Sequence, residues 1–227
     1  MIVKQVAFAL RLIDDFNGKE ITRQVFSFEI DGILAKPIEK QEGLYIFLEP
    51  VNASVKLRII SGYYHTKTVT IEKGVLDEKE PVATVRIYGK PGQGYSKVCG
   101  FHQGKIEDKN VVYPVEVCAK SGKDTGLTLK EIRQEEGKTY LICNGYTKEL
   151  IIGKPFCLTN EKITDIFVIL EKKGVNWYRI EETILGEYEP GTPIQRVYRS
   201  LTDESGYYSI PVNADEQDKI TEVIKLQ

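Results

Sequence analysis

The chain has 227 residues, a hydrophobic content of 41%, and 31 Lys and Arg against 33 Asp and Glu, which gives a net charge of −2. This length can bury a sizeable core and suits one large domain or two small ones. The near-neutral charge excludes a general electrostatic attraction to nucleic acid or to an anionic membrane, so we expect neither as a partner.

The first residues do not have the pattern of a secretory signal. Arg11, Asp14 and Asp15 interrupt the apolar run early, and no small-residue cleavage site follows. No window of about 18 apolar residues occurs anywhere in the chain, so no membrane span is expected. We therefore expect a cytoplasmic protein.

Apolar side chains alternate with a period of two along the first 72 residues, which predicts half-buried strands. A recurring detail is a glycine directly before a strand: "GLYIFLEP" at 43–50 returns as "SGYYSIPV" at 205–212. The apolar rows comprise Val6, Phe8, Leu10 and Leu12; Phe26, Phe28 and Ile30; Val55, Leu57 and Ile59; and Val69 and Ile71.

The clearest boundary is "YGKPGQGYSK" at residues 88–97, because clustered Gly and Pro disfavour a regular element. We predict one domain at 1–90 and another at 91–227. Gly89 and Gly94 have the outer spacing of a phosphate loop. Tyr95 and Ser96, however, occupy the positions of the required Lys and Ser/Thr, so no nucleotide site is expected.

The second half continues with strand patterns bounded by turn residues, typical of an antiparallel sandwich or barrel. One segment, "LTLKEIRQEEGK", is compatible with two structures. Thr128 and Glu131 form a possible capping box for a short helix, and a strand followed by a charged turn fits equally. The strand candidates are "YPVEVCA", "KTYLICN", "DIFVILEKKG", "IQRVYRS", "GYYSIPV" and "KITEVIKL".

The sequence contains few candidate catalytic or metal-binding residues. Cys99 and His102 have metal-ligand spacing, but no second close pair follows to complete a tetrahedral site. The four cysteines, Cys99, Cys118, Cys143 and Cys157, suit free buried thiols better than disulfides. His65 is expected on a strand surface, and no metalloprotease or nucleophile-elbow motif occurs. We predict no enzyme, no catalytic residue, no metal and no cofactor or small-molecule substrate.

The first half resembles the carboxypeptidase regulatory-like, or prealbumin-like, domain over residues 5–72. Its features are an opening Asp-Asn-Gly turn, a middle strand after Gly43 and a closing strand–turn–strand. The second half repeats parts of it, in "GKIEDKNVVYPVEV" and "TDESGYYSIPV". The residues in matching positions are Asp14, Asn17, Gly18, Ile21, Gly43, Tyr45, Phe47, Leu57, Ile59, Gly62, Tyr63 and Val69, then Asp203, Gly206, Tyr208 and Ile210.

The resemblance implies an all-β protein: a prealbumin-like antiparallel β-sandwich followed by a second, elaborated β domain. About 90 residues separate the two partial matches of the second half. Either a small β-barrel near 112–172 is inserted or appended there, or the matches belong to different modules.

The resemblance also implies a structural rather than a catalytic role. By analogy of architecture, we expect a subunit of a large particle assembled from protein partners, such as the baseplate or cap of a phage tail or phage-tail-like contractile injection system. The alternative is a carbohydrate-binding or adhesive module that uses Tyr63, Tyr64, Trp177, Tyr178, Tyr207 and Tyr208 for stacking.

Contacts with partners are expected at loops and sheet edges. The candidates are the loops "GVLDEKEP" and "EETILGEYEPGTP" and the terminal strand 219–226. That strand either closes its own sheet or docks into a neighbour.

Overall fold

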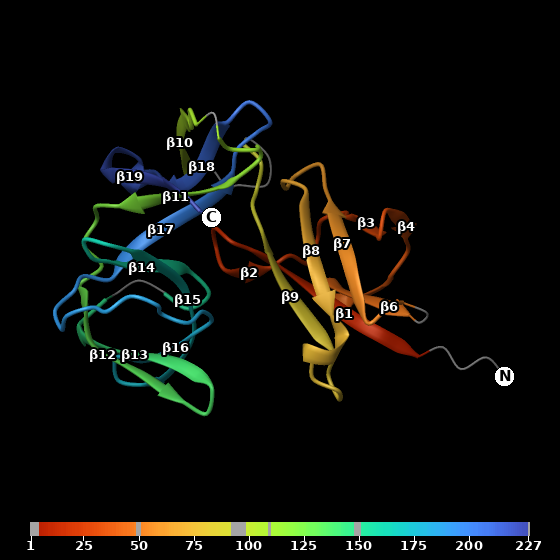
Figure 1. Cartoon of the computed structure of the whole chain (residues 1–227), viewed down its shortest axis with the longest axis horizontal. Coiled ribbons are helices and arrows are strands. Elements are labelled where there is room, and N and C mark those ends of the chain that lie inside the picture. Colours follow the sequence, from red (N-terminus) through yellow and green to blue (C-terminus); the bar gives the residue numbers. More distant parts are fainter. Residues whose placement is uncertain (1–4, 49–50, 92–98, 109, 148–150, 227) are drawn as a thin grey trace. The chain divides into compact units, whose positions relative to one another are not determined.

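Strands make up almost all of the regular structure in Figure 1. The computed structural model describes residues 5–48, 51–91, 99–108, 110–147 and 151–226. The structure is 57% strand and 5% helix, which confirms the all-β class. The helical elements of these residues are three 3-10 turns: η1 (Gln41–Gly43), η2 (Lys73–Val75) and η3 (Ala214–Lys219).

Contacts between residues divide the chain into two compact units. The first comprises residues 1–14 and 19–94, and the second comprises residues 15–18 and 95–227. Most of the Gly- and Pro-rich stretch at 88–97, including Gly94, Tyr95 and Ser96 of the rejected phosphate loop, lies outside the described residues.

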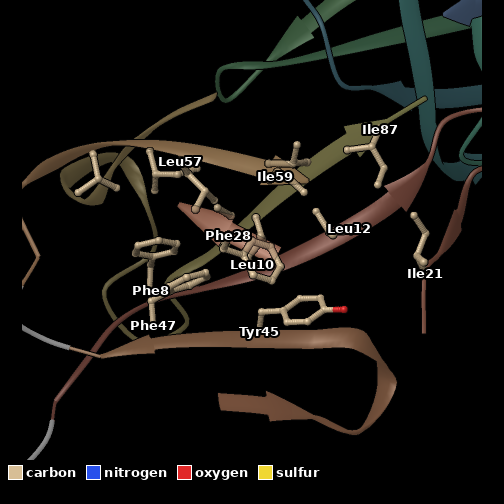
Figure 2. Packing of buried hydrophobic residues seen from close by; sticks show 14 of the residues in the cluster. Phe8, Leu10, Leu12, Ile21, Phe28, Tyr45, Phe47, Leu57, Ile59 and Ile87 are labelled. Carbon is tan, nitrogen blue, oxygen red and sulfur yellow. The ribbon is translucent and has the colours of Figure 1, made fainter. Parts of the chain in front are cut away.

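The first unit contains a five-stranded and a four-stranded sheet that enclose one core (Figure 2). The five-stranded sheet has the order β2 (Lys19–Glu20), β1 (Val6–Asp14), β6 (Leu44–Leu48) and β5 (Ile38–Lys40), with β9 (Val82–Ile87) also paired to β1. The four-stranded sheet has the order β4 (Ile33–Ala35), β3 (Ser27–Ile30), β7 (Ser54–Ile60) and β8 (Lys67–Glu72).

The alternating rows of the sequence form this core. Phe8, Leu10 and Leu12 of β1 are fully buried, as are Leu57 and Ile59 of β7. Full burial of each such side chain contributes about 1.5–3 kcal/mol relative to exposure. The burial of alternate residues therefore fixes which face of each strand points inward.

One strand departs from the expected antiparallel pattern. β9 pairs with β1 in parallel, with Ala9 opposite Val82 and Asp14 opposite Ile87. A parallel neighbour needs a crossover rather than a hairpin. The intervening strands, which include all four of the other sheet, provide that crossover. The other strand pairs of the described part of this unit are antiparallel.

The repeated strand start has a backbone cause. Gly43 before β6 has φ 72° and Gly206 before β18 (Tyr207–Asn213) has φ 84°, a region that favours glycine. A Cβ at Gly43 would lie 2.2 Å from the Ile21 carbonyl oxygen, and one at Gly206 would lie 2.7 Å from the Ile106 carbonyl oxygen. Both glycines therefore allow a close backbone approach.

The second unit contains an eight-stranded sheet and a two-stranded sheet, β10 (Cys99–Lys105) with β18. The larger sheet has the order β12 (Leu127–Glu135), β13 (Lys138–Gly145), β16 (Trp177–Ile180), β15 (Thr164–Gly174), β14 (Pro155–Thr159), β17 (Gln195–Leu201), β11 (Glu116–Ser121) and β19 (Ile220–Lys225).

Strands β12 to β17 of this sheet curl into a barrel-like shape. Residues 191–194, directly before β17, meet the start of β12: Leu129 N donates to Thr192 O at 2.8 Å, and Ile194 N donates to Leu127 O at 3.0 Å. The side chains enclosed include Leu127, Leu141, Phe156, Phe167, Tyr178 and Ile194. The curled part takes in β12 to β16 and the start of β17, whereas the barrel expected near 112–172 began before β11 and ended within β15. β12 to β16 lie in the chain between the paired strands β11 and β17.

The ambiguous segment at 127–138 is a strand and a turn. β12 pairs with β13 along its whole length, and Glu136 and Gly137 form the turn with φ 51° and 72°. The register shifts between Leu129 and Glu131. This bulge breaks the period of two, because the extra residue moves the next apolar side chain by one position, and the result mimics a helical pattern.

The remaining strands form a small sandwich. β11, β17 and β19 bury side chains against β18, with Val117, Tyr198 and Val212 in the core. "GKIEDKNVVYPVEV" was expected to give an opening turn with its return strand, but β10 and β11 do not pair. β10 pairs with β18, and β11 lies between β17 and β19.

A buried ion pair holds residues 15–18 within the second unit. Arg199 donates from Nε to Asp15 Oδ2 at 3.0 Å and from Nη2 to Asp15 Oδ1. Arg196, also buried, donates to the Phe16 and Pro155 carbonyl oxygens, both at 3.1 Å. Burial lowers the pKa of the Arg196 guanidinium.

Candidate interaction surfaces

The predicted chemistry-bearing residues do not converge on one site. Cys99 and His102 lie on β10, and a spacing of three on a strand places side chains on opposite faces. None of the four cysteines forms a disulfide, and Cys118, Cys143 and Cys157 are buried. Burial raises the pKa of Cys143 to about 12 and that of Cys157 to about 11. These thiols are protonated core residues at neutral pH.

His65 was expected on a strand surface, and this was wrong. It precedes β8 and is half-buried, and its Nε2 has no hydrogen-bond partner. Burial, and then the nearby charge of Lys90, lowers the pKa of His65.

The aromatic pairs proposed for sugar stacking are split between surface and core. Tyr63 is exposed while Tyr64 is buried and donates to Asp14 Oδ2 at 3.0 Å. Tyr178 is buried beside a half-buried Trp177, and Tyr207 is exposed beside a half-buried Tyr208. Trp177 and Tyr207 lie on strands of different sheets. The six aromatic residues therefore do not form one stacking face.

The first unit exposes apolar side chains along one edge. Ile33 and Leu34 of β4 are 74% and 64% exposed, and Ile38 of β5 is also exposed. β4 and β5 are the edge strands of the two facing sheets and are joined by Lys36 and Pro37. We refer to Ile33, Leu34 and Ile38 as the apolar edge.

Two open grooves flank the apolar edge. One, of about 600 Å³, is lined mainly by apolar residues that include Ile30, Leu34, Phe47 and Val51. The other, of about 300 Å³, lies on the side of Phe26, Phe28 and Tyr45 and shares Leu34, Ala35 and Lys36. A partner's side chain can enter here beside exposed leucine and isoleucine. The sequence did not indicate that this edge is exposed, because the same residue types also occur in buried strands.

The second unit carries the predicted loop contact at residues 181–193. We call its residues 181–190 the acidic loop. The Asp165 side chain holds it in place. Asp165 is 7% exposed, and its Oδ2 accepts from Leu185 N at 3.1 Å, from Gly186 N at 2.7 Å and from the Tyr188 hydroxyl at 2.9 Å. Burial, followed by the hydrogen bond with Asp165, raises the pKa of Tyr188.

Further bonds fix the loop on both sides. Asn160 Nδ2 donates to Glu187 O at 2.8 Å. The inward-turned Glu182 accepts from Val168 N at 2.7 Å through Oε2. Gly186 packs so closely that a Cβ would lie 2.7 Å from Ile163 Cγ2 and 2.8 Å from the Tyr188 ring. The sequence predicted the loop as a contact point but not these anchors, because they come from β15 and from the turn between β14 and β15.

The outer side of the acidic loop alternates regularly. Exposed and half-buried residues alternate from 181 to 189, and Pro190 is also exposed. The alternating exposed residues are Glu181, Thr183, Leu185, Glu187 and Glu189. Leu185 is 78% exposed although its backbone is fixed. It borders an open groove of about 700 Å³, which Ile163 also lines.

The two other predicted contact points are less distinctive. In "GVLDEKEP", Asp77 Oδ1 accepts from Lys79 N at 2.8 Å and from Glu80 N at 3.0 Å, which closes a local turn. The terminal strand β19 pairs with β11, so it closes its own sheet and forms the edge. Of the two alternatives for that strand, closing its own sheet or docking into a neighbour, the chain by itself shows the first.

Comparisons of the chain with protein-family models, curated proteins and solved structures find no match. The prealbumin-like family therefore stays a prediction that rests on the motif residues. Within the described residues, no helix is long and apolar enough to cross a membrane. In the same residues, no three or more His, Cys, Asp or Glu side chains are grouped to hold a metal ion.

Proposed function

We propose that this chain is a non-enzymatic structural subunit, held by protein partners in a large particle such as a phage tail or phage-tail-like contractile injection system. The observation that carries the proposal is the apolar edge. Ile33 and Leu34 are each more than half exposed and lie together beside two grooves. Single exposed apolar residues are ordinary, but a cluster beside a groove is typical of a surface that a partner covers.

The prealbumin-like resemblance supports the same function, since domains of that kind commonly serve as spacers and adhesive modules. The parts of the particle that the analogy suggests are the baseplate and the cap. Edge strands also provide backbone groups to which a partner's strand can add.

The test uses the tagged full chain expressed from its native locus. We expect it to sediment with a particle far heavier than 25.8 kDa. The double substitution Ile33→Asp and Leu34→Asp should lower the particle-bound fraction about tenfold, because charge is placed in an apolar contact. Val75→Asp is the matched control, since Val75 belongs to the same unit, is 77% exposed and lines neither groove.

Two results would contradict the proposal. One is a chain that runs only as a free monomer in lysate. The other is saturable binding to a glycan array that Trp177→Ala removes, which would favour the carbohydrate-binding alternative.

A further inference from the structure

We infer that the acidic loop is a docking site for a partner protein whose contact surface is apolar at its centre and basic at its rim. The inference rests on the proposed function, because it names the chemistry of one partner in the assembly. Three properties of residues 181–190 support the inference: a fixed backbone, an exposed leucine and charged side chains that are all acidic.

The fixed backbone makes Leu185 an effective anchor. Its N–H and that of Gly186 are held by the buried Asp165 carboxylate, and Asn160 holds the Glu187 carbonyl. A loop that is already ordered loses little conformational entropy when a partner binds. Central apolar anchors that enter a partner's pocket commonly provide most of the binding energy. The leucine side chain therefore specifies an apolar pocket opposite it.

The acidic residues around Leu185 indicate which residue types should line the rim of the partner's pocket. Glu187 and Glu189 are exposed on the same outward row, and residues 181–190 contain no Lys or Arg. The neighbouring turn contributes one acidic and one basic residue, Glu161 and Lys162, to the groove. Their charges balance, so the outward surface of the loop stays acidic. Lys and Arg on the partner are the complementary groups, and such rim charges mainly set partner choice and association rate.

Other occupants fit this surface less well. The phosphates of nucleic acid would face the glutamates and be repelled. A second copy using the same loop would place like charges opposite each other, which costs free energy at a symmetric contact. A basic, apolar protein surface satisfies both the leucine and the carboxylates.

The first experiment measures the particle-bound fraction of full-chain variants. Leu185→Asp should lower it about tenfold, since it removes the anchor. The pair Glu187→Lys and Glu189→Lys should lower it too, and wild-type binding should weaken when salt is raised from about 0.05 to 0.5 M. The controls are Val175→Asp, at a site 89% exposed in the same unit, and Glu204→Lys, at an exposed turn. Fluorescence of Trp177, the one tryptophan, checks that each variant is folded.

The second experiment identifies the partner's chemistry. A photo-reactive benzophenone amino acid in place of Leu185 is activated in the intact particle, and the cross-linked peptide is sequenced. We expect apolar residues flanked by Lys or Arg. An acidic or uncharged peptide, or one from a second copy of this chain, would overturn the inference. So would full particle binding by folded Leu185→Asp and charge-reversed variants.

The two proposals fail in different ways. If no particle forms with the wild-type chain, the structural function fails. If the particle forms, depends on the apolar edge and does not respond to changes in the acidic loop, only this inference fails.

Discussion

At the scale of single residues, the buried pair of Asp15 and Arg199 has the largest expected effect on stability. The Asp15 carboxylate is fully buried and accepts two bonds from one guanidinium. Removing one partner of such a pair leaves a buried charge uncompensated. We predict that Arg199→Met lowers the free energy of unfolding of the second unit by about 3–5 kcal/mol.

Urea unfolding followed by Trp177 fluorescence measures this effect in the second unit. Lys105→Ala is the control, because Lys105 pairs with Glu107 on the surface, where an ion pair contributes less than about 1 kcal/mol. Equal stability of Arg199→Met and wild type would show that the pair is not needed to hold residues 15–18.

His65 gives the first unit a dependence on pH. Burial lowers its pKa in the folded chain below the ordinary value of 6.5. Below pH 6.5 the unfolded chain therefore binds more protons than the folded chain, and stability is lost as the pH falls through that value. We predict faster amide hydrogen exchange at Leu57 and Ile59 at pH 5.5 than at pH 7.5, after correction for intrinsic exchange rates. These two values lie about one pH unit on either side of the ordinary histidine pKa, which is enough to change its protonation in the unfolded chain. His65→Gln should remove the difference and His102→Gln should keep it.

At the scale of elements, the terminal strand β19 contributes to two cores. Val223 packs against the sandwich core, and Ile224 packs against the cluster that contains Cys118 and Cys157. Deletion of residues 218–227 should therefore lower the stability of the second unit by ~1–3 kcal/mol, since both side chains are only partly buried. Trp177 fluorescence during urea unfolding measures this.

Lys225→Ala is the control for the deletion, since it removes only an exposed contact with Asp108. A truncated chain with wild-type stability that leaves the particle would instead indicate that β19 docks into a neighbour.

The elements also show what the sequence can predict. Strands with one face buried, such as β6 and β7, follow from alternation alone. β14 was missed because four of its five residues are buried and alternation disappears. β12 was ambiguous because Thr128 and Glu131 also fit the capping box of a short helix. The parallel pairing of β9 depends on the path of the chain between the sheets. For the candidate sites, the sequence indicated the acidic loop but not Asp165, whose role depends on a contact 20 residues away.

At the scale of the whole molecule, the first unit has its own core. The buried members of that core all fall between Ala7 and Ile87. We predict that residues 1–90 expressed alone fold and give a dispersed amide spectrum. Residues 15–18 should show random-coil shifts, because Arg196 and Arg199 are missing from the fragment. A collapsed spectrum would show that the division at residue 90 is wrong.

The insertion of β12 to β16 between β11 and β17 determines when the second unit can fold during synthesis. On the ribosome, β11 must wait for both of its neighbours: Cys118 pairs with Arg199 on one side and with Ile224 on the other. β10 waits similarly for β18, since Cys99 lies opposite Asn213. Such distant pairings are slow to form and leave strand edges open meanwhile. In the nascent chain Cys118 therefore lacks the cover of β17 and β19 until both strands have been made, although the folded chain buries that thiol completely.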